Sequence, residues 1–143
     1  MEMEIKLKNG IDKLVFGMKP KDVVGILGLP SKQFLDEDEN KIYQYNHEKL
    51  HLTFYEDEDF RLGYIVCANE NLKLLNKKII SQNIFEIQKS LEIDGLKFIL
   101  EDFDTFEHYF NENNWLILSV EFNQITKLEI GAIIKDDEFV WKF

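Results

Sequence analysis

The sequence predicts an α+β protein in which a unit made of one helix and an antiparallel hairpin occurs twice in tandem. In each half, a short segment with helical spacing of apolar residues precedes segments in which apolar and polar residues alternate. The second set of segments repeats the first at a nearly constant distance. With 143 residues, 45% of them hydrophobic and 13% aromatic, the chain can bury a real core. The predicted units are residues 1–71 and 72–143.

The first predicted helix spans residues 20–27. Pro20 suits the first helical turn, because its missing N–H would have no helical partner there. Gly28 and Pro30 predict the end of the helix, since glycine followed by proline commonly terminates one. The apolar stripe between these residues consists of Val23, Val24, Ile26 and Leu27.

Three strands are predicted after this helix. The first is residues 42–45, and the second is residues 50–55, in which apolar and more polar side chains alternate. The acidic residues 56–59 predict a turn, and alternation resumes in residues 62–66. Two alternating segments joined by a short polar turn predict an antiparallel hairpin. The apolar positions after the turn are Leu62, Tyr64 and Val66.

The second half repeats this order. Its helix is predicted from the spacing of Ile84, Ile87, Gln88 and Leu91. Ser81 and Asn83 are both candidates for its N-cap. The hairpins match without a gap at an offset of 66, which pairs Leu50 with Leu116, Leu52 with Leu118, Phe54 with Val120, Leu62 with Leu128, and Tyr64 with Ile130. This register indicates an internal duplication, although any two amphipathic hairpins align to some degree when their apolar residues alternate.

The C-terminal residues 139–143 also alternate, which predicts a final strand that ties the chain end to the fold. As an exposed edge, residues 138–143 would be able to pair with a second chain. We therefore expect a monomer or a weak dimer.

The segment from Val15 to Ala68 resembles a known repeat. The run GMKPKDV at residues 17–23, the helix end LGLP at residues 27–30 and the tyrosine pair at positions 43 and 45 are similar to the repeat shared by the BamE/SmpA envelope lipoproteins and the β-lactamase inhibitor protein. Residues 80–134 match it only in outline. The resemblance implies two units that share a curved antiparallel sheet, with the helices on one face of it.

The chain departs from these families in ways that bear on location. A lipoprotein of this kind needs a signal peptide and an N-terminal acylated cysteine, whereas the single cysteine, Cys67, lies inside a predicted strand. One cysteine also rules out the disulfides of the secreted inhibitor. Residues 1–10 contain no continuous apolar stretch, so we expect no export signal and a cytoplasmic protein.

The charge of the chain points to the class of partner. Its 17 basic and 27 acidic residues give a formal net charge of -10, shared evenly between the two halves. A negative field of this kind repels nucleic acids and anionic membranes, and no run approaches the roughly 18 apolar residues of a membrane span. A basic protein partner would be attracted. The simpler interpretation of the charge is solubility.

One motif suggests a metal. His47, Glu48 and His51 spell H-E-x-x-H, which on a helix places two imidazoles on one face to bind zinc. Alternation of apolar residues from position 50 to position 54 favours a strand instead. Residues four apart on a strand are separated by about 13 Å, too far for one zinc ion. We therefore expect coincidence and no cofactor, and keep a zinc hydrolase as the alternative.

Three acidic segments are predicted to be solvated loops or hairpin tips: residues 36–40, 56–59 and 136–138. The first of them resembles a calcium loop of the EF-hand type, but Lys41 stands where that loop has its glycine and His47 where it has its last glutamate. Cys67 is predicted to be a small core residue rather than a nucleophile.

The predicted sheet leaves one face for binding. The side chains predicted to point to the helices are Leu50, Leu52, Phe54, Leu116, Leu118 and Val120. The partner-binding candidates on the opposite face are His51, Tyr55, Trp115 and Ile117. Exposed aromatics with a polar rim are typical of protein-binding surfaces. The alternative is that Trp115 and Ile117 cover one another or lie under the C-terminal strand.

The leading functional hypothesis is a non-catalytic protein-binding protein that uses this face. Its concrete form is an intracellular immunity protein, or an inhibitor that neutralises a basic toxin or enzyme. The zinc hydrolase is a second hypothesis, and a housekeeping module with an unknown ligand is a third.

Overall fold

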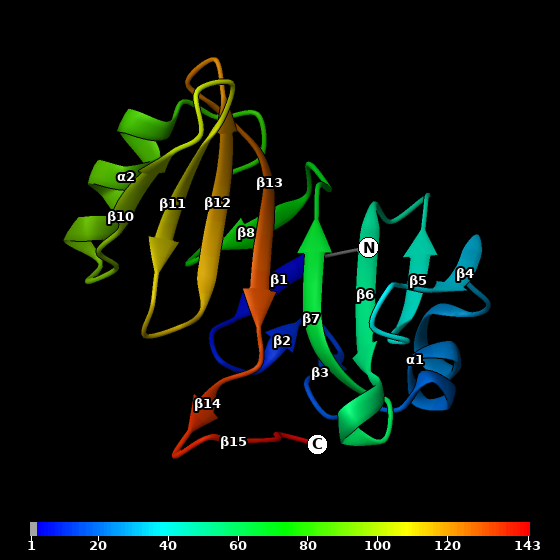
Figure 1. Cartoon of the computed structure of the whole chain (residues 1–143). Coiled ribbons are helices and arrows are strands. Elements are labelled where there is room, and N and C mark those ends of the chain that lie inside the picture. Colours follow the sequence, from blue (N-terminus) through cyan, green and yellow to red (C-terminus); the bar gives the residue numbers. More distant parts are fainter. Residues whose placement is uncertain (1–2) are drawn as a thin grey trace.

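The computed structural model describes residues 3–143, which form an α+β fold with two helices and extensive antiparallel sheet (Figure 1). This confirms the predicted fold class. The first half contains β1 (Met3–Lys6), β2 (Gly10–Ile11), β3 (Leu14–Val15), α1 (Pro20–Leu27), β4 (Lys32–Leu35), β5 (Lys41–Tyr45), β6 (Leu50–Tyr55), the 3-10 turn η1 (Glu56–Glu58) and β7 (Arg61–Cys67). The second half contains β8 (Leu72–Leu74), β9 (Lys77–Lys78), α2 (Ile84–Ile93), β10 (Ile99–Asp102), β11 (Glu107–Asn111), β12 (Leu116–Glu121) and β13 (Gln124–Gly131), followed by β14 (Ile134–Lys135) and β15 (Glu138–Phe139).

The main layer is an eight-stranded sheet in the order β10-β11-β12-β13-β7-β6-β5-β4, with every neighbouring pair antiparallel. A second sheet has the order β3-β2-β1-β8-β9, and its β1 and β8 are parallel. In Figure 1 this smaller sheet lies behind the centre of the large one, with α2 beside β10 at one end and α1 near β4 and β5 at the other.

One core holds these layers together. Leu50, Leu52 and Phe54 of β6, and Leu116, Leu118 and Val120 of β12, are each 0% exposed, as predicted. Val23 of α1 and Ile84 and Leu91 of α2 belong to the same buried cluster, as do Met3 and Leu72 of the small sheet. Both helices therefore pack on the inner face of the large sheet. The small sheet, which the sequence did not predict, completes that cover.

The helix ends follow from local chemistry. Helix α1 has the predicted bounds, and the Asp22 carboxylate accepts a hydrogen bond from the Lys19 main-chain N–H at 2.9 Å. In α2 the N-cap is Asn83, whose side-chain oxygen accepts from the main-chain N–H groups of Phe85 and Glu86. Of the two candidates for this cap, Asn83 is therefore the one that the structure uses.

The two halves meet at β7 and β13 with approximate two-fold symmetry. Within its own hairpin, Ile65 pairs with Leu52, and Leu128 pairs with the equivalent Leu118. Across the junction, Leu128 pairs with Cys67 and Ile130 pairs with Ile65. Exchange of the two halves converts each of these junction pairs into the other. The pair of Val66 and Glu129 lies between them and is left unchanged by this exchange, so it marks the centre of the approximate two-fold symmetry.

The ungapped offset of 66 is correct for β5 and β6 but wrong beyond them. Ile65 and Leu128 hold equivalent positions, so β7 and β13 differ by 63. The pairing of Leu62 with Leu128 was therefore a misalignment, and Leu62 corresponds to Ile125 instead. The reason is loop length, because residues 56–60 separate the paired strand ends in the first hairpin and only residues 122–123 do so in the second.

A β-bulge occurs at the same place in both hairpins, between Thr53 and Phe54 and between Ser119 and Val120. The extra residue in the first hairpin is Gly63, opposite Phe54. Beyond it the buried residues of β7 are Ile65 and Cys67, not Tyr64 and Val66 as strict alternation predicted. The bulge therefore turns the Tyr64 side chain to the outer face of the sheet.

The C-terminal segment is anchored, but less of it is strand than predicted. Only Glu138–Phe139 pairs, with β14, as a two-stranded sheet. The N–H groups of Lys142 and Phe143 donate to the main-chain oxygen of Phe16 at 3.0 and 3.1 Å. The prediction of an edge strand over residues 138–143 is therefore wrong in its length. Within residues 3–143, neither helix has the length and apolarity that a membrane crossing requires.

Candidate functional site

The four predicted binding residues lie on or beside the outer face of the large sheet, but they do not form one patch. His51 is exposed on β6, and Ile117 is half-buried on β12. Trp115 precedes β12 in a turn with φ of 46°, and its ring meets Phe110 edge-on at 5.2 Å. Tyr55 lies 5.5 Å from the ring of Phe139. The C-terminal segment therefore covers the outer face at its Tyr55 end.

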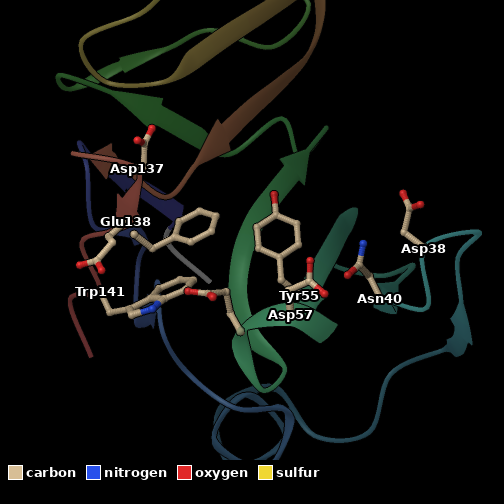
Figure 2. A pocket seen from close by; sticks show the side chains of 9 residues that line it. Asp38, Asn40, Tyr55, Asp57, Asp137, Glu138 and Trp141 are labelled. Carbon is tan, nitrogen blue, oxygen red and sulfur yellow. The ribbon is translucent and has the colours of Figure 1, made fainter.

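This cover creates a cleft of about 880 Å³, which we call the acidic cleft (Figure 2). Its lining residues are Asp38, Asn40, Tyr55, Asp57, Glu58, Asp137, Glu138, Phe139 and Trp141. Figure 2 shows Tyr55 in the middle, with Asp38 and Asn40 on one side and Asp137, Glu138 and Trp141 on the other. The three acidic segments that the sequence left as separate loop tips thus surround one cavity.

Aromatic rings form the apolar part of the acidic cleft. The ring of Trp141 stacks on that of Phe139 at 4.7 Å and an interplanar angle of 19°. The Tyr55 ring lies against Gly63, where an added Cβ would be 2.1 Å from the ring. Glycine at the bulge therefore lets the Tyr55 ring settle on the sheet beside Phe139.

Hydrogen bonds fix the acidic loops relative to one another. The Asp36 carboxylate accepts from the main-chain N–H groups of Asp38 and Asn40, each at 2.9 Å. The Asn40 side-chain oxygen accepts from the N–H of Glu56 at 2.9 Å, which joins the two loops. Lys19 donates to the Asp59 carboxylate at 2.6 Å and so ties the second loop to the start of α1. Asp38, Asp57 and Glu58 therefore lie on two loops that are tied to each other and to the start of α1.

The acidic cleft is strongly negative. Within residues 3–143, none of the five lining carboxylates (Asp38, Asp57, Glu58, Asp137, Glu138) forms an ion pair with a basic side chain. Arg61 donates to the main-chain oxygen of Glu58, not to a carboxylate. Burial raises the pKa of the Tyr55 hydroxyl, and the negative charge of Asp36 adds to the rise. Apolar rings beside unpaired carboxylates suit a cation that carries apolar surface, such as lysine or arginine.

The H-E-x-x-H segment does not form the helix that a zinc peptidase site needs. His47 and Glu48 lie in the turn before β6, and His51 is the second residue of that strand. The predicted strand is confirmed, and the two histidines do not share a helical face. In the described part of the chain, no group of three or more His, Cys, Asp and Glu side chains is arranged to hold a metal ion.

A second polar cluster lies near the centre of the outer face. The Tyr64 hydroxyl donates to Glu129 at 2.6 Å, and the His108 Nε2 is 4.0 Å from the other Glu129 oxygen. Burial raises the pKa of Tyr64, and its hydrogen bond to Glu129 adds to the rise. Ser119 Oγ is buried near them and has no hydrogen-bond partner in the described residues. The cluster joins β7 to β13, and therefore one half of the molecule to the other.

Cys67 is a core residue, as predicted. It is 0% exposed, and burial raises the pKa of its thiol to about 11. A thiol with so little thiolate at neutral pH is a poor nucleophile.

Sequence reasoning missed most of the acidic cleft. Phe139 and Trp141 were expected on a strand, and the acidic tips were expected to be separate. The shared sign of the three acidic segments was visible, but their meeting depends on where the C-terminal segment crosses the sheet.

No known family model and no curated protein matches this sequence. Two solved structures share the fold. An extracellular protein containing an SCP domain from Bacillus anthracis strain Ames has a TM-score of 0.54 at 14% identity, covering 93% of this chain and 50% of that one. A DUF4309 family protein from Bacillus subtilis strain 168 has a TM-score of 0.52 at 14% identity, covering 80% and 78%.

This chain therefore spans about half the length of the first neighbour. At an identity this low, the structural similarity establishes the fold alone. Neither neighbour is described as a BamE/SmpA or β-lactamase inhibitor repeat, so that resemblance stays a prediction.

Proposed function

We propose that this protein binds a basic protein partner in the acidic cleft and performs no catalysis there. The observation that carries this proposal is that five carboxylates, none of them ion-paired within residues 3–143, meet the rings of Tyr55, Phe139 and Trp141 around one cavity. The rings offer apolar contact area, and the carboxylates supply the charge that attracts and orients a cation.

The concrete form of the proposal is an immunity protein or inhibitor that covers a basic surface of a toxin or enzyme. The net charge of -10 would speed association with such a partner and make it sensitive to salt. The proposed binding surface is thus the acidic cleft and not the free sheet face predicted around His51 and Trp115. Tyr55 belongs to both surfaces. A housekeeping module with an unknown ligand is the remaining alternative.

We propose the cytoplasm as the site of action. One structural neighbour is described as extracellular, so the location has to be measured in the native host. Fractionation followed by immunodetection would place the protein inside the cell if the proposal holds. Recovery from the medium or the cell surface would overturn this part of the proposal while leaving the binding proposal intact.

The binding proposal is tested by comparison of two matched variants. The cleft variant carries Asp57→Asn, Glu58→Gln, Asp137→Asn and Glu138→Gln. The control variant removes the same charge from exposed carboxylates elsewhere, with Glu70→Gln, Glu86→Gln, Glu92→Gln and Glu112→Gln. Each protein is used to capture partners from lysate of the native host at low salt, and captured proteins are identified by mass spectrometry. Each is then purified and titrated by calorimetry.

We expect the wild type and the control variant to bind one basic protein with similar affinity. The cleft variant should bind it at least tenfold more weakly. Several charge contacts are removed, and a loss of about 1.4 kcal/mol of binding free energy already raises the dissociation constant tenfold. Equal binding by the cleft and control variants, or the absence of any specific basic protein, would overturn the proposal.

A further inference from the structure

Both edges of the eight-stranded sheet are open. Within residues 3–143, β4 pairs only with β5, and β10 pairs only with β11. Every residue of both strands is exposed, including Phe34 at 40%, Leu35 at 58%, Ile99 at 65% and Leu100 at 54%. An edge with free main-chain groups and apolar side chains is a template for another strand. The two edges are therefore the most exposed pairing surfaces of the fold.

The direction of the strands allows the sheet to continue into a second copy. All seven neighbouring pairs in the sheet are antiparallel, so the first and last strands run in opposite directions. A second copy placed beside the first in the same orientation therefore brings its β10 antiparallel to β4. The outer faces of the two sheets then stay on the same side.

The register follows from which residues share the outer face. Lys32 and Phe34 lie on it in β4, since they pair with Gln44 and Ile42 in the chain of cross-strand partners that leads to Glu129 and Tyr64. In β10 the outer residues are Ile99 and Glu101, through Phe110 and His108. Two antiparallel registers keep the faces matched and overlap three residues of each strand. One sets Lys32 opposite Glu101 and Phe34 opposite Ile99, whereas the other sets Phe34 opposite Glu101. Opposite charges and aromatic–β-branched pairs are favourable cross-strand neighbours.

Pairing of identical edges is less favourable in the registers that keep Lys32 or Glu101 within the contact. In a two-fold β4–β4 pair centred on Gln33, Lys32 would lie opposite Phe34. In a two-fold β10–β10 pair centred on Leu100, Ile99 would lie opposite Glu101. Each arrangement sets a charge against an apolar side chain twice, whereas the unlike edges match charge with charge and apolar with apolar.

We propose that β4 of one copy pairs with β10 of a second copy, in the register that joins Lys32 to Glu101 and Phe34 to Ile99. This contact is heterologous, so each added copy leaves one open β4 and one open β10, and assembly continues beyond the dimer. The acidic cleft lies on neither edge strand, and the proposal is independent of the function proposed for it.

Sedimentation velocity on the full chain, from micromolar to millimolar concentration at physiological salt, tests the proposal. Wild type should show concentration-dependent species larger than a dimer. Lys32→Glu and Glu101→Lys should each weaken association about fivefold or more, and the double variant should restore it, because the charges are exchanged across the same contact. Lys89→Glu and Glu86→Lys, which make the same charge changes on exposed positions of α2, are the matched controls.

Circular dichroism shows that each variant is folded before it is compared. A wild type that remains monomeric at millimolar concentration would overturn the proposal, as would assembly that stops at a dimer. Edge variants that associate like their α2 controls, or a double variant weaker than either single one, would also overturn it.

Discussion

The two hairpins of the large sheet share their strands and their bulge but differ in the loop at the tip. In the first hairpin, residues 56–60 form a 3-10 turn with three carboxylates followed by Asp59 and Phe60. In the second, Phe122 and Asn123 alone close the chain, both with positive φ. Three extra residues therefore separate two otherwise equivalent hairpins.

This difference explains why the acidic cleft forms beside the first hairpin and not beside the second. The longer loop reaches the β4–β5 turn through the hydrogen bond between Glu56 and Asn40, and it supplies Asp57 and Glu58 to the cavity. The other wall comes from β15 and Trp141, which follow the second unit. The acidic cleft is thus built from the longer loop and the C-terminal segment, on a sheet whose two halves follow the same pairing pattern.

The largest expected effect tests whether the two halves share one core. Leu52 and Leu118 hold equivalent positions and are both 0% exposed. Leu52→Ala and Leu118→Ala should each lower the free energy of unfolding by about 3 kcal/mol, because each leaves a cavity in a fully packed site. Chemical denaturation followed by fluorescence and by circular dichroism should give one coincident transition for each variant. Separate transitions for the two halves would break the comparison.

The next effect comes from conversion of the first hairpin into the second. Replacement of residues 56–60 by Asn-Gly keeps the pairing of Tyr55 with Arg61 in the form that the second hairpin uses. We expect a loss of about 1–2 kcal/mol in the free energy of unfolding, since half-buried Phe60 and the Lys19–Asp59 contact are removed. Denaturation in urea measures this loss.

The same variant should lose binding of the basic partner, because two of the five cleft carboxylates are gone. A control that inserts three residues between Phe122 and Asn123 lengthens the other hairpin and should leave that binding unchanged. Retained binding after the loop replacement would show that the insertion does not build the site.

The repeated scaffold was largely predictable because local patterns determine it. The bounds of α1 and β6 were correct, since proline, glycine and strict alternation act within a few residues. The alignment failed at Leu62 because three residues are inserted before it and a bulge follows it. Apolar residues therefore stand at nearly every position that an offset of 66 or of 63 requires. Alternation alone cannot detect a shift of this kind.

The candidate site was less predictable because it depends on contacts between segments distant in the sequence. Tyr55 was identified from its place on the outer face. Its neighbours Phe139 and Trp141 reach it only because Lys142 and Phe143 are hydrogen-bonded to Phe16. No local pattern in a C-terminal segment encodes a partner that lies more than a hundred positions earlier in the chain.

A smaller effect is expected at the tip of the second hairpin. Phe122 has a φ of 50° and is 95% exposed, so its side chain gains little burial while its backbone is strained. Phe122→Gly should raise the free energy of unfolding by about 0.5 kcal/mol, the relief of left-handed strain less the added freedom of glycine in the unfolded chain. Thermal denaturation measures it. A loss of stability would show that the aromatic ring makes a contact that outweighs the strain.

The smallest effect concerns the ion pair that only the longer loop has. The hydrogen bond from Lys19 and its positive charge hold the pKa of Asp59 below its usual value. A carboxyl group whose pKa is lower when folded stabilises the fold above its unfolded pKa of about 4, and this contribution is lost as pH falls through the folded pKa. Asp59→Asn should therefore be less stable than wild type at pH 7 and equal to it in strong acid. Asparagine suits the backbone here, since Asp59 has a φ of 56°.

Lys19→Met should show the same pH dependence in urea titrations, and the double variant should lose no more stability than either single variant. A difference from wild type that persists at low pH would mean that the substitutions act on the loop conformation, not on the ion pair.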